Sequence, residues 1–115
     1  MAEPQKPVYL RLRDVIAASI LDGSFGDGDA LPSVRSFAAD QGANPLTVAK
    51  AYQTFQDQNL IEVKRGIGLF VARGARARLR QIERARFLSE TWPPVKAQMD
   101  LLEIDFADLP ERERA

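Results

Sequence analysis

The chain has no cysteine and no histidine, and its apolar runs are far too short to cross a bilayer. The lack of cysteine excludes disulfides and thiolate metal sites, so nothing in the sequence favours secretion. The lack of histidine removes the side chain that most often performs general acid–base catalysis near neutral pH. The first residues have no signal-peptide core. We therefore expect a cytoplasmic protein that is not an enzyme, does not associate with a membrane, and needs no metal or other cofactor.

Length and charge are compatible with a small globular protein. The 115 residues are 45% hydrophobic and 28% charged, with a net charge of zero. The charges are segregated: residues 64–86 hold eight basic side chains and one acidic one, whereas residues 96–115 hold three basic and six acidic ones. A local positive surface of this kind attracts phosphate groups even in a neutral protein. The alternative for the arginines after residue 72 is a solvated helix face.

Two short helical patterns lie between Leu31 and Gln58. Ser33 is a good N-cap for a helix over residues 34–41, which Gly42 ends. Asn44 and Pro45 then supply a second N-cap and a favourable first helical residue for a helix over 45–58. The apolar residues of each helix recur at helical spacing, so each has one face for the core. Leu46, Thr47 and Lys50 fall on the outward face of the second helix, which would be the recognition helix.

A β-hairpin is predicted to follow. Asn59 can adopt a left-handed conformation after the helix, residues 60–65 and 69–72 have strand patterns, and Gly66-Ile67-Gly68 turns the chain between them. Lys64 and Arg65 would lie at the tip, where they could contact a phosphate backbone or enter a minor groove. The order of elements predicts a mainly α fold with a small β-hairpin, a winged helix-turn-helix.

The remaining chain is predicted to be helical. A helix over 75–90 would be broken at Trp92-Pro93-Pro94 and resumed over 95–102. Arg78 and Arg86 lie near its apolar side, and the acidic residues of the tail are candidate partners for them, within one subunit or across two. So much apolar surface on a short segment predicts pairing with a second copy. The alternative is a cap folded onto the same monomer.

Several motifs together resemble the DNA-binding domain of the GntR family of bacterial transcription regulators: Leu-Pro-Ser-x-Arg from Leu31, Asn-Pro-x-Thr-Val from Asn44, and Arg-Gly-x-Gly-x-Phe-Val from Arg65. The short tail resembles that of the small YtrA-type subfamily. The resemblance implies DNA contacts by Arg35, Thr47 and the Arg65-Gly66 tip. Lys50 stands at a place where a basic residue is usual, whereas Asn59 and Leu46 depart from the common pattern. The full predicted DNA-binding set is Ser33, Arg35, Asn44, Leu46, Thr47, Lys50, Lys64, Arg65 and Gly66.

We accordingly expect a DNA-binding domain over residues 7–72 and a helical dimerisation segment over 73–115. Because one recognition helix reads only a few base pairs, we expect a homodimer bound to an inverted-repeat operator in double-stranded DNA. The resemblance implies repression of a nearby operon, often one encoding a transporter. The alternatives are a winged helix used for protein–protein contact and a non-specific DNA-binding module. The identity of any small-molecule effector is unknown. Such an effector would have to lie at the dimer interface or between the segments, where four side chains either line a cleft or form plain core: Phe87, Trp92, Met99 and Phe106.

Overall fold

The structure is a computed structural model that describes residues 6–111, so the last four residues of the expected dimerisation segment lie outside it. The chain divides into two compact units, Met1–Arg80 and Gln81–Ala115. The first contains α1 (Val8–Leu21), α2 (Val34–Gln41), α3 (Pro45–Asp57), β1 (Ile61–Lys64), β2 (Gly68–Val71) and the start of α4 (Ala75–Arg86). The second continues with a π-helical turn (Phe87–Thr91), α5 (Trp92–Leu101) and a 3-10 turn (Phe106–Asp108). None of the described helices is long and apolar enough to span a membrane.

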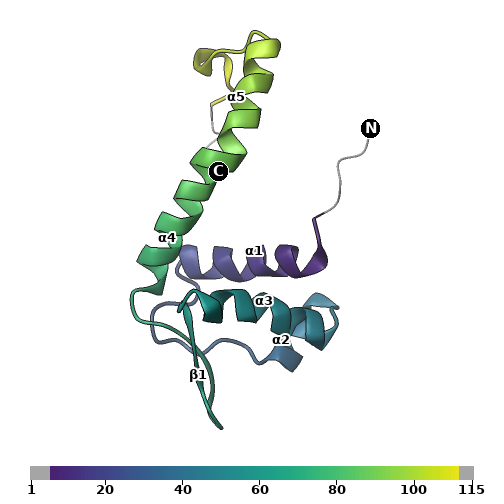
Figure 1. Cartoon of the computed structure of the whole chain (residues 1–115), viewed down its shortest axis with the longest axis vertical. Coiled ribbons are helices and arrows are strands. Elements are labelled where there is room, and N and C mark those ends of the chain that lie inside the picture. The colour runs from purple at the N-terminus through teal and green to yellow at the C-terminus, as the bar shows by residue number, and fades with distance from the viewer. Residues whose placement is uncertain (1–5, 112–115) are drawn as a thin grey trace. The chain divides into compact units, whose positions relative to one another are not determined.

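α1 and α3 form the centre of the first unit and lie side by side (Figure 1). Leu12, Ile16 and Ile20 recur every four residues along α1 and are buried. α3 buries Val48, Ala51, Tyr52 and Phe55, the apolar set that the helical spacing predicts. The core therefore lies between these two helices, with α2 packed against α3.

The helix-turn-helix forms at the residues that the sequence indicates. Ser33 accepts a hydrogen bond from the Ser36 amide at 3.1 Å, which caps α2. Gly42 ends α2 in the left-handed conformation with φ of 62°, where the absence of a Cβ removes the strain. Asn44 caps α3 by accepting from the Leu46 amide at 2.8 Å, and Pro45 is the first helical residue. The predicted limits of both helices are confirmed to within a residue.

Tyr52 ties the recognition helix to the turn before α2. Its hydroxyl donates a hydrogen bond to the Pro32 carbonyl at 2.7 Å, and its ring stacks on Phe37 with centroids 5.9 Å apart. Burial raises the pKa of Tyr52 from 10 to about 12. Below pH 10 folded and unfolded chains both keep the phenol proton. Between pH 10 and about 12 only the folded chain keeps it, so stability must fall as the pH rises through this range.

We expect Tyr52→Phe to remove that alkaline loss of stability. At pH 7 the variant should lose about 1 kcal/mol, because the Pro32 carbonyl loses its partner. Urea unfolding of both proteins at pH 7 and at steps between pH 9.5 and 12 measures the two effects. Other groups titrate in both proteins alike, so the difference between the curves reports Tyr52. If stability falls with pH equally in both proteins, folding does not raise the pKa of Tyr52.

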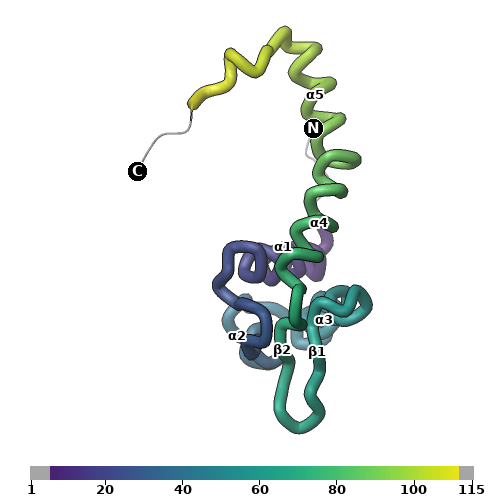
Figure 2. Tube along the Cα trace, turned by 90° about the vertical axis from the view of Figure 1, so that its left-hand side faces the viewer, coloured from purple at the N-terminus to yellow at the C-terminus, as the bar shows by residue number. Residues whose placement is uncertain are grey.

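The hairpin has a three-residue turn. β1 and β2 pair antiparallel from Ile61 opposite Val71 to Lys64 opposite Gly68. The Ile67 amide donates to the Lys64 carbonyl at 2.9 Å, which closes the turn. Figure 2 shows the hairpin of β1 and β2 at the lower end of the view. Arg65 therefore belongs to the turn and Gly68 to a strand, a shift of one residue from the prediction. Asn59 has the predicted left-handed backbone, with φ of 59°.

The segment before α2 was not predicted to pair with the hairpin. The Leu31 amide donates to the Leu69 carbonyl at 2.8 Å, and the Val71 amide donates to the Asp29 carbonyl at 2.9 Å. Ala30 forms an isolated bridge with Phe70. The outer edge of β2 is thus covered by backbone, which fixes the hairpin to the rest of the first unit.

Two arginines of the basic run hold carbonyl groups of the first unit. Arg76 Nε donates to the Leu21 carbonyl at 3.0 Å, at the end of α1. Arg78 donates to the Arg73 and Asn59 carbonyls at 3.0 and 2.8 Å. Arg86 lies 3.5 Å from Glu83. Arg78 and Arg86 thus have acceptors close to them in the same chain. Contacts of these arginines with the acidic tail of a second subunit stay a prediction.

The prediction of a helix break at Trp92-Pro93-Pro94 is wrong. The helix passes through a π-helical turn, Phe87–Thr91, and continues directly into α5. Proline lacks an amide hydrogen and its ring clashes with the carbonyl four residues earlier. The wider turn, in which the Trp92 amide bonds to the Phe87 carbonyl five residues back, accommodates this clash without ending the helix.

Candidate nucleic-acid interface

The predicted DNA-binding residues of α2 lie at its exposed first turn. Ser33 uses an oxygen lone pair to cap the helix, which leaves its hydroxyl hydrogen able to donate to a phosphate. Arg35 is exposed, and no hydrogen bond or ion pair holds its guanidinium among residues 6–111. The core takes only Phe37 and Ala38 from this helix. Arg35 therefore has no packing role in the fold and five N–H donors available to a ligand.

α3 presents four of the predicted residues. Asn44 accepts the capping bond through Oδ1, so its amide group can still donate outward. Leu46 is 80% exposed, Lys50 is exposed and Thr47 is half-buried. The face that carries them is opposite the buried residues of α3. The start of a recognition helix is the part that contacts base edges in helix-turn-helix proteins.

Both predicted lysines lie over aromatic rings. Lys50 Nζ is 4.0 Å from the centroid of the Tyr9 ring of α1, and Lys64 Nζ is 4.6 Å from that of Phe70 in β2. A cation over a ring face is attracted by the ring quadrupole. The rings limit the directions in which these flexible side chains can point. Tyr9 and Phe70 are thus functional candidates that were absent from the predicted set. Phe70 belongs to the Arg-Gly-x-Gly-x-Phe-Val motif, but the contacts of both rings with lysines follow only from the three-dimensional arrangement.

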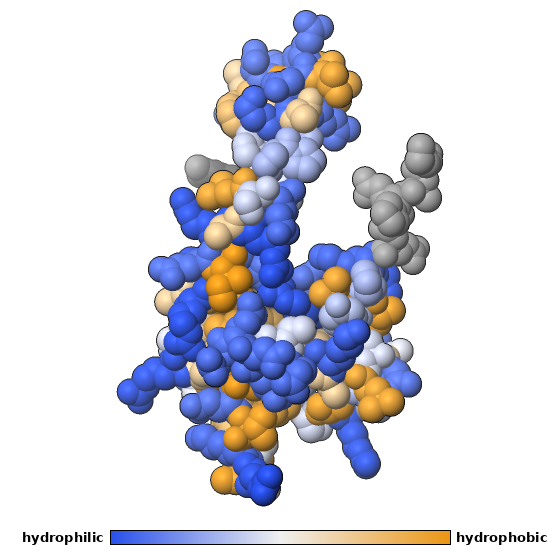
Figure 3. Space-filling view, viewed as in Figure 1, coloured by the Kyte–Doolittle hydropathy of each residue, from blue (hydrophilic) through white to orange (hydrophobic). Residues whose placement is uncertain are grey.

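The tip of the hairpin is exposed on all sides. Arg65, Gly66 and Ile67 form the turn, and Gly66 has φ of 76°. Ile67 and Val63 are exposed apolar side chains next to Lys64 and Arg65. Figure 3 shows apolar and charged surface side by side around the hairpin at the lower end of the view. A narrow basic tip with small residues can approach a DNA backbone closely.

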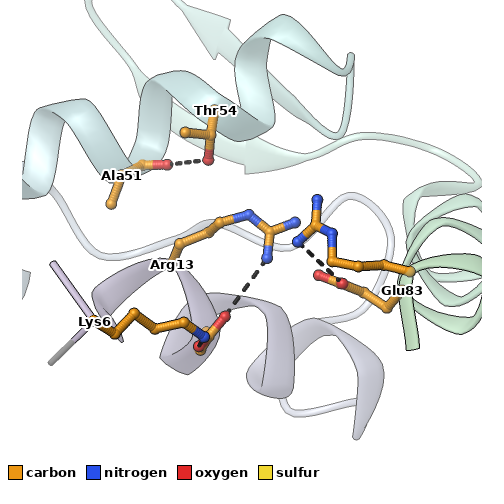
Figure 4. Close-up of polar contacts among 7 residues, drawn as sticks. Lys6, Arg13, Ala51, Thr54 and Glu83 are labelled. Atoms are coloured by element: carbon orange, nitrogen blue, oxygen red, sulfur yellow. Dashed lines mark hydrogen bonds and ion pairs between the residues drawn. The ribbon is translucent and has the colours of Figure 1, made fainter. Parts of the chain in front are cut away.

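Arg13 was not identified from the sequence and is nearly buried, at 4% exposure. It lies between α1 and α3 (Figure 4), with its guanidinium carbon 5.2 Å from the centroid of the Phe55 ring and Nη1 3.6 Å from Asp14. Asp14 is in turn 2.6 Å from Lys6. Thr54, also shown in Figure 4, donates a hydrogen bond to the Ala51 carbonyl at 2.7 Å. Arg13 faces the core and contacts the recognition helix, α3, through the ring of Phe55 on its buried side.

The predicted effector residues only partly converge. A cavity of about 150 Å³ in the second unit is lined by Trp92, Met99 and Phe106, together with Lys96 and Ile104, while Phe87 is not part of it. Trp92 and Phe106 stack on each other with centroids 5.7 Å apart. Small-molecule sites usually have about 300–1,000 Å³. Trp92 and Met99 are half-buried and Phe106 is 71% exposed, so these side chains form a partly covered apolar cluster within the second unit.

The elements and their exposed faces define a winged helix-turn-helix, with a recognition helix (α3) and a wing (β1 and β2). The family model for bacterial regulatory proteins of the gntR family matches residues 8–71. The chain belongs to this family, whose members are transcription regulators.

Curated relatives agree with this assignment. The uncharacterized HTH-type transcriptional regulator YhcF of Bacillus subtilis is 34% identical over 73 residues, which cover 64% of this chain and 60% of YhcF. The HTH-type transcriptional repressor YtrA of the same organism is 37% identical over 73 residues, covering 64% of this chain and 56% of YtrA. The chain thus matches a little over half the length of these relatives, and the YtrA-like subfamily is the one it resembles.

Solved structures share the fold. A transcriptional regulator from Oenococcus oeni has a TM-score of 0.75 and 33% identity, over 94% of this chain and 89% of that one. The DNA-binding domain of AraR in complex with its operator has a TM-score of 0.60 and 25% identity, over 63% of this chain and 87% of that one. The first likeness covers nearly the whole chain, and therefore includes helices that follow the wing, whereas the second covers less than two thirds of it.

Proposed function

We propose that this protein is a transcriptional repressor that binds, as a homodimer, an inverted-repeat operator near the operon it controls. The observation that carries the proposal is that eight of the nine predicted DNA-binding residues are exposed and the ninth, Thr47, is half-buried. They lie at the start of α2, at the start of α3 and on the wing, outside the apolar core. Such side chains are available to DNA at little cost in stability.

Each part has a role suited to its chemistry. The start of α3, with Asn44, Leu46 and Thr47, reads base edges in the major groove. Arg35 and Lys50 add charge beside it, and Lys64, Arg65 and Gly66 bring the wing against the adjacent backbone or minor groove. Phosphate contacts supply most of the affinity. The operator complex of the AraR domain and the name of the repressor YtrA support the assignment.

The second unit favours a dimer. Between Gln81 and Glu111 the structure describes no fully buried side chain. Several large apolar side chains there are exposed: Phe87, Leu88, Val95, Leu101, Leu102, Phe106 and Leu109. A second copy of the segment would cover such surface. Two recognition helices in one particle read two half-sites at once, which multiplies the discrimination of each.

The test is a fluorescence-anisotropy titration of the purified protein with its own upstream promoter and with a scrambled duplex, at two salt concentrations. Under the proposal, binding to the promoter is selective and persists at moderate salt. Equal binding to both duplexes that disappears with salt would assign a non-specific DNA-binding module. Absence of binding to either duplex would point to a protein-binding winged helix.

Arg35→Ala gives the matched variant for this titration. We expect promoter affinity to fall by about 1–3 kcal/mol, because the guanidinium makes a specific base or phosphate contact. Thermal unfolding should be unchanged, since Arg35 is exposed and no described residue bonds to it. Unchanged affinity would remove Arg35 from the interface.

A further inference from the structure

Leu46 is the least expected residue of the candidate interface. It is the second residue of α3 and its side chain is 80% exposed, whereas the neighbouring Val48 is fully buried. The core takes other residues from this helix, so the fold does not account for a large apolar side chain at this place. An exposed leucine at the leading end of a recognition helix calls for a ligand that offers an apolar group.

The backbone at this residue is already committed. The Leu46 amide donates to Asn44 Oδ1 at 2.8 Å to cap the helix. Neither the side chain nor this amide can therefore donate a hydrogen bond to a base or a phosphate. What remains is the aliphatic group itself, which can recognise only another apolar surface.

The major groove offers one apolar group among its base edges, the 5-methyl group of thymine. We propose that Leu46 is a specificity-determining residue that contacts the methyl group of a thymine in each half-site of the operator. This inference rests on the proposed function, since it requires α3 to enter the major groove. The neighbouring Thr47 and Lys50 are left to contact polar edges or phosphates, and Leu46 fixes the position at which thymine is preferred.

The expected effect is that of one buried methyl group. Removing a methyl group from water is worth about a fourfold change in an equilibrium constant. Replacing a thymine by uracil deletes this methyl group and keeps the base-pairing edge. At the contacted thymine we therefore expect affinity to fall about three- to fivefold in each half-site.

The experiment begins with selection of preferred duplexes from a random pool by the 115-residue chain. Each thymine of the selected sequence is then replaced in turn by uracil, and dissociation constants are measured for the wild type and for Leu46→Ala. The wild type should show one thymine per half-site at which the methyl group matters. Leu46→Ala should bind the two forms of that site equally, because the variant has lost the group that contacts the methyl.

Two further variants isolate the contact. Ile67→Ala removes another exposed apolar side chain, at 74% exposure on the wing, and should leave the effect of that methyl group intact. Leu46→Gln should shift selection at the same position from thymine to adenine, whose edge pairs with a glutamine amide. All three variants should unfold at the same temperature as the wild type, because both side chains are exposed.

The outcomes separate this inference from the proposed function. If selection enriches a sequence but no thymine methyl group matters, or if Leu46→Ala keeps the sensitivity, the thymine contact is excluded and operator binding stands. A persistent effect in Leu46→Ala would reflect DNA shape instead. If selection enriches no sequence, the proposed function is overturned together with the thymine contact.

Discussion

Phe55→Ala should lower the free energy of unfolding by about 3–5 kcal/mol, the usual cost of truncating a buried aromatic residue. Phe55 is fully buried in α3, and its ring lies beneath the Arg13 guanidinium of α1 at 5.2 Å. Alanine would remove the ring that both helices pack around. Because small domains have only about 5–15 kcal/mol of stability, this loss would be a large share of the total.

Urea unfolding followed by circular dichroism measures this loss. Leu46→Ala, an aliphatic truncation at the exposed start of the same helix, is the matched control and should change stability by less than about 0.5 kcal/mol. A loss below about 1 kcal/mol in Phe55→Ala would contradict the packing of α1 on α3 around this ring.

A chain that ends at Arg80 should fold, remain monomeric and bind the operator at least about 100-fold more weakly than the full chain. It keeps the whole first compact unit, Met1–Arg80, including the fully buried Ala75 and Leu79 of α4. It lacks the exposed apolar side chains that we propose as the dimer interface. Sedimentation equilibrium and anisotropy titration measure the two losses separately.

A chain that ends at Ala72 provides the contrast. It loses the buried Leu79 and the bonds from Arg76 and Arg78 to the carbonyls of Leu21 and Asn59. We expect it to be less stable than the chain ending at Arg80 by several kcal/mol, about the cost of a buried leucine and its neighbours. If the chain ending at Arg80 still dimerises, the proposed role of the second unit is wrong.

The helix-turn-helix was predictable because local chemistry determines it. Ser33, Gly42 and Asn44 act within a few residues of their own position, through capping bonds and a left-handed backbone. The wing followed from its glycines in the same way. The family resemblance added the DNA-binding set, and two members of that set, Lys50 and Lys64, proved to lie over aromatic rings.

What the sequence did not predict depends on contacts between distant residues. Arg13 is a charged residue in a helix that would ordinarily be placed outward, yet it lies over Phe55, more than forty positions away in the chain. The bridge between Ala30 and Phe70 likewise joins residues that are forty positions apart, and the residues around Ala30 have no strand pattern that could have predicted it. The prolines after Trp92 predicted a break because a regular α-helix cannot contain them without a clash. The π-helical turn before them removes this clash, so the helix continues.

The covered edge of β2 has a consequence for the behaviour of the protein in solution. A bare strand edge can recruit the edge of another molecule and start aggregation. Here the backbone from Gly28 to Leu31 occupies one side of the hairpin, so β1 is its remaining open edge. β1 has only four residues, and Glu62 and Lys64 place opposite charges along it. The wing can therefore project into solvent, ready for DNA, with little tendency to polymerise strand to strand.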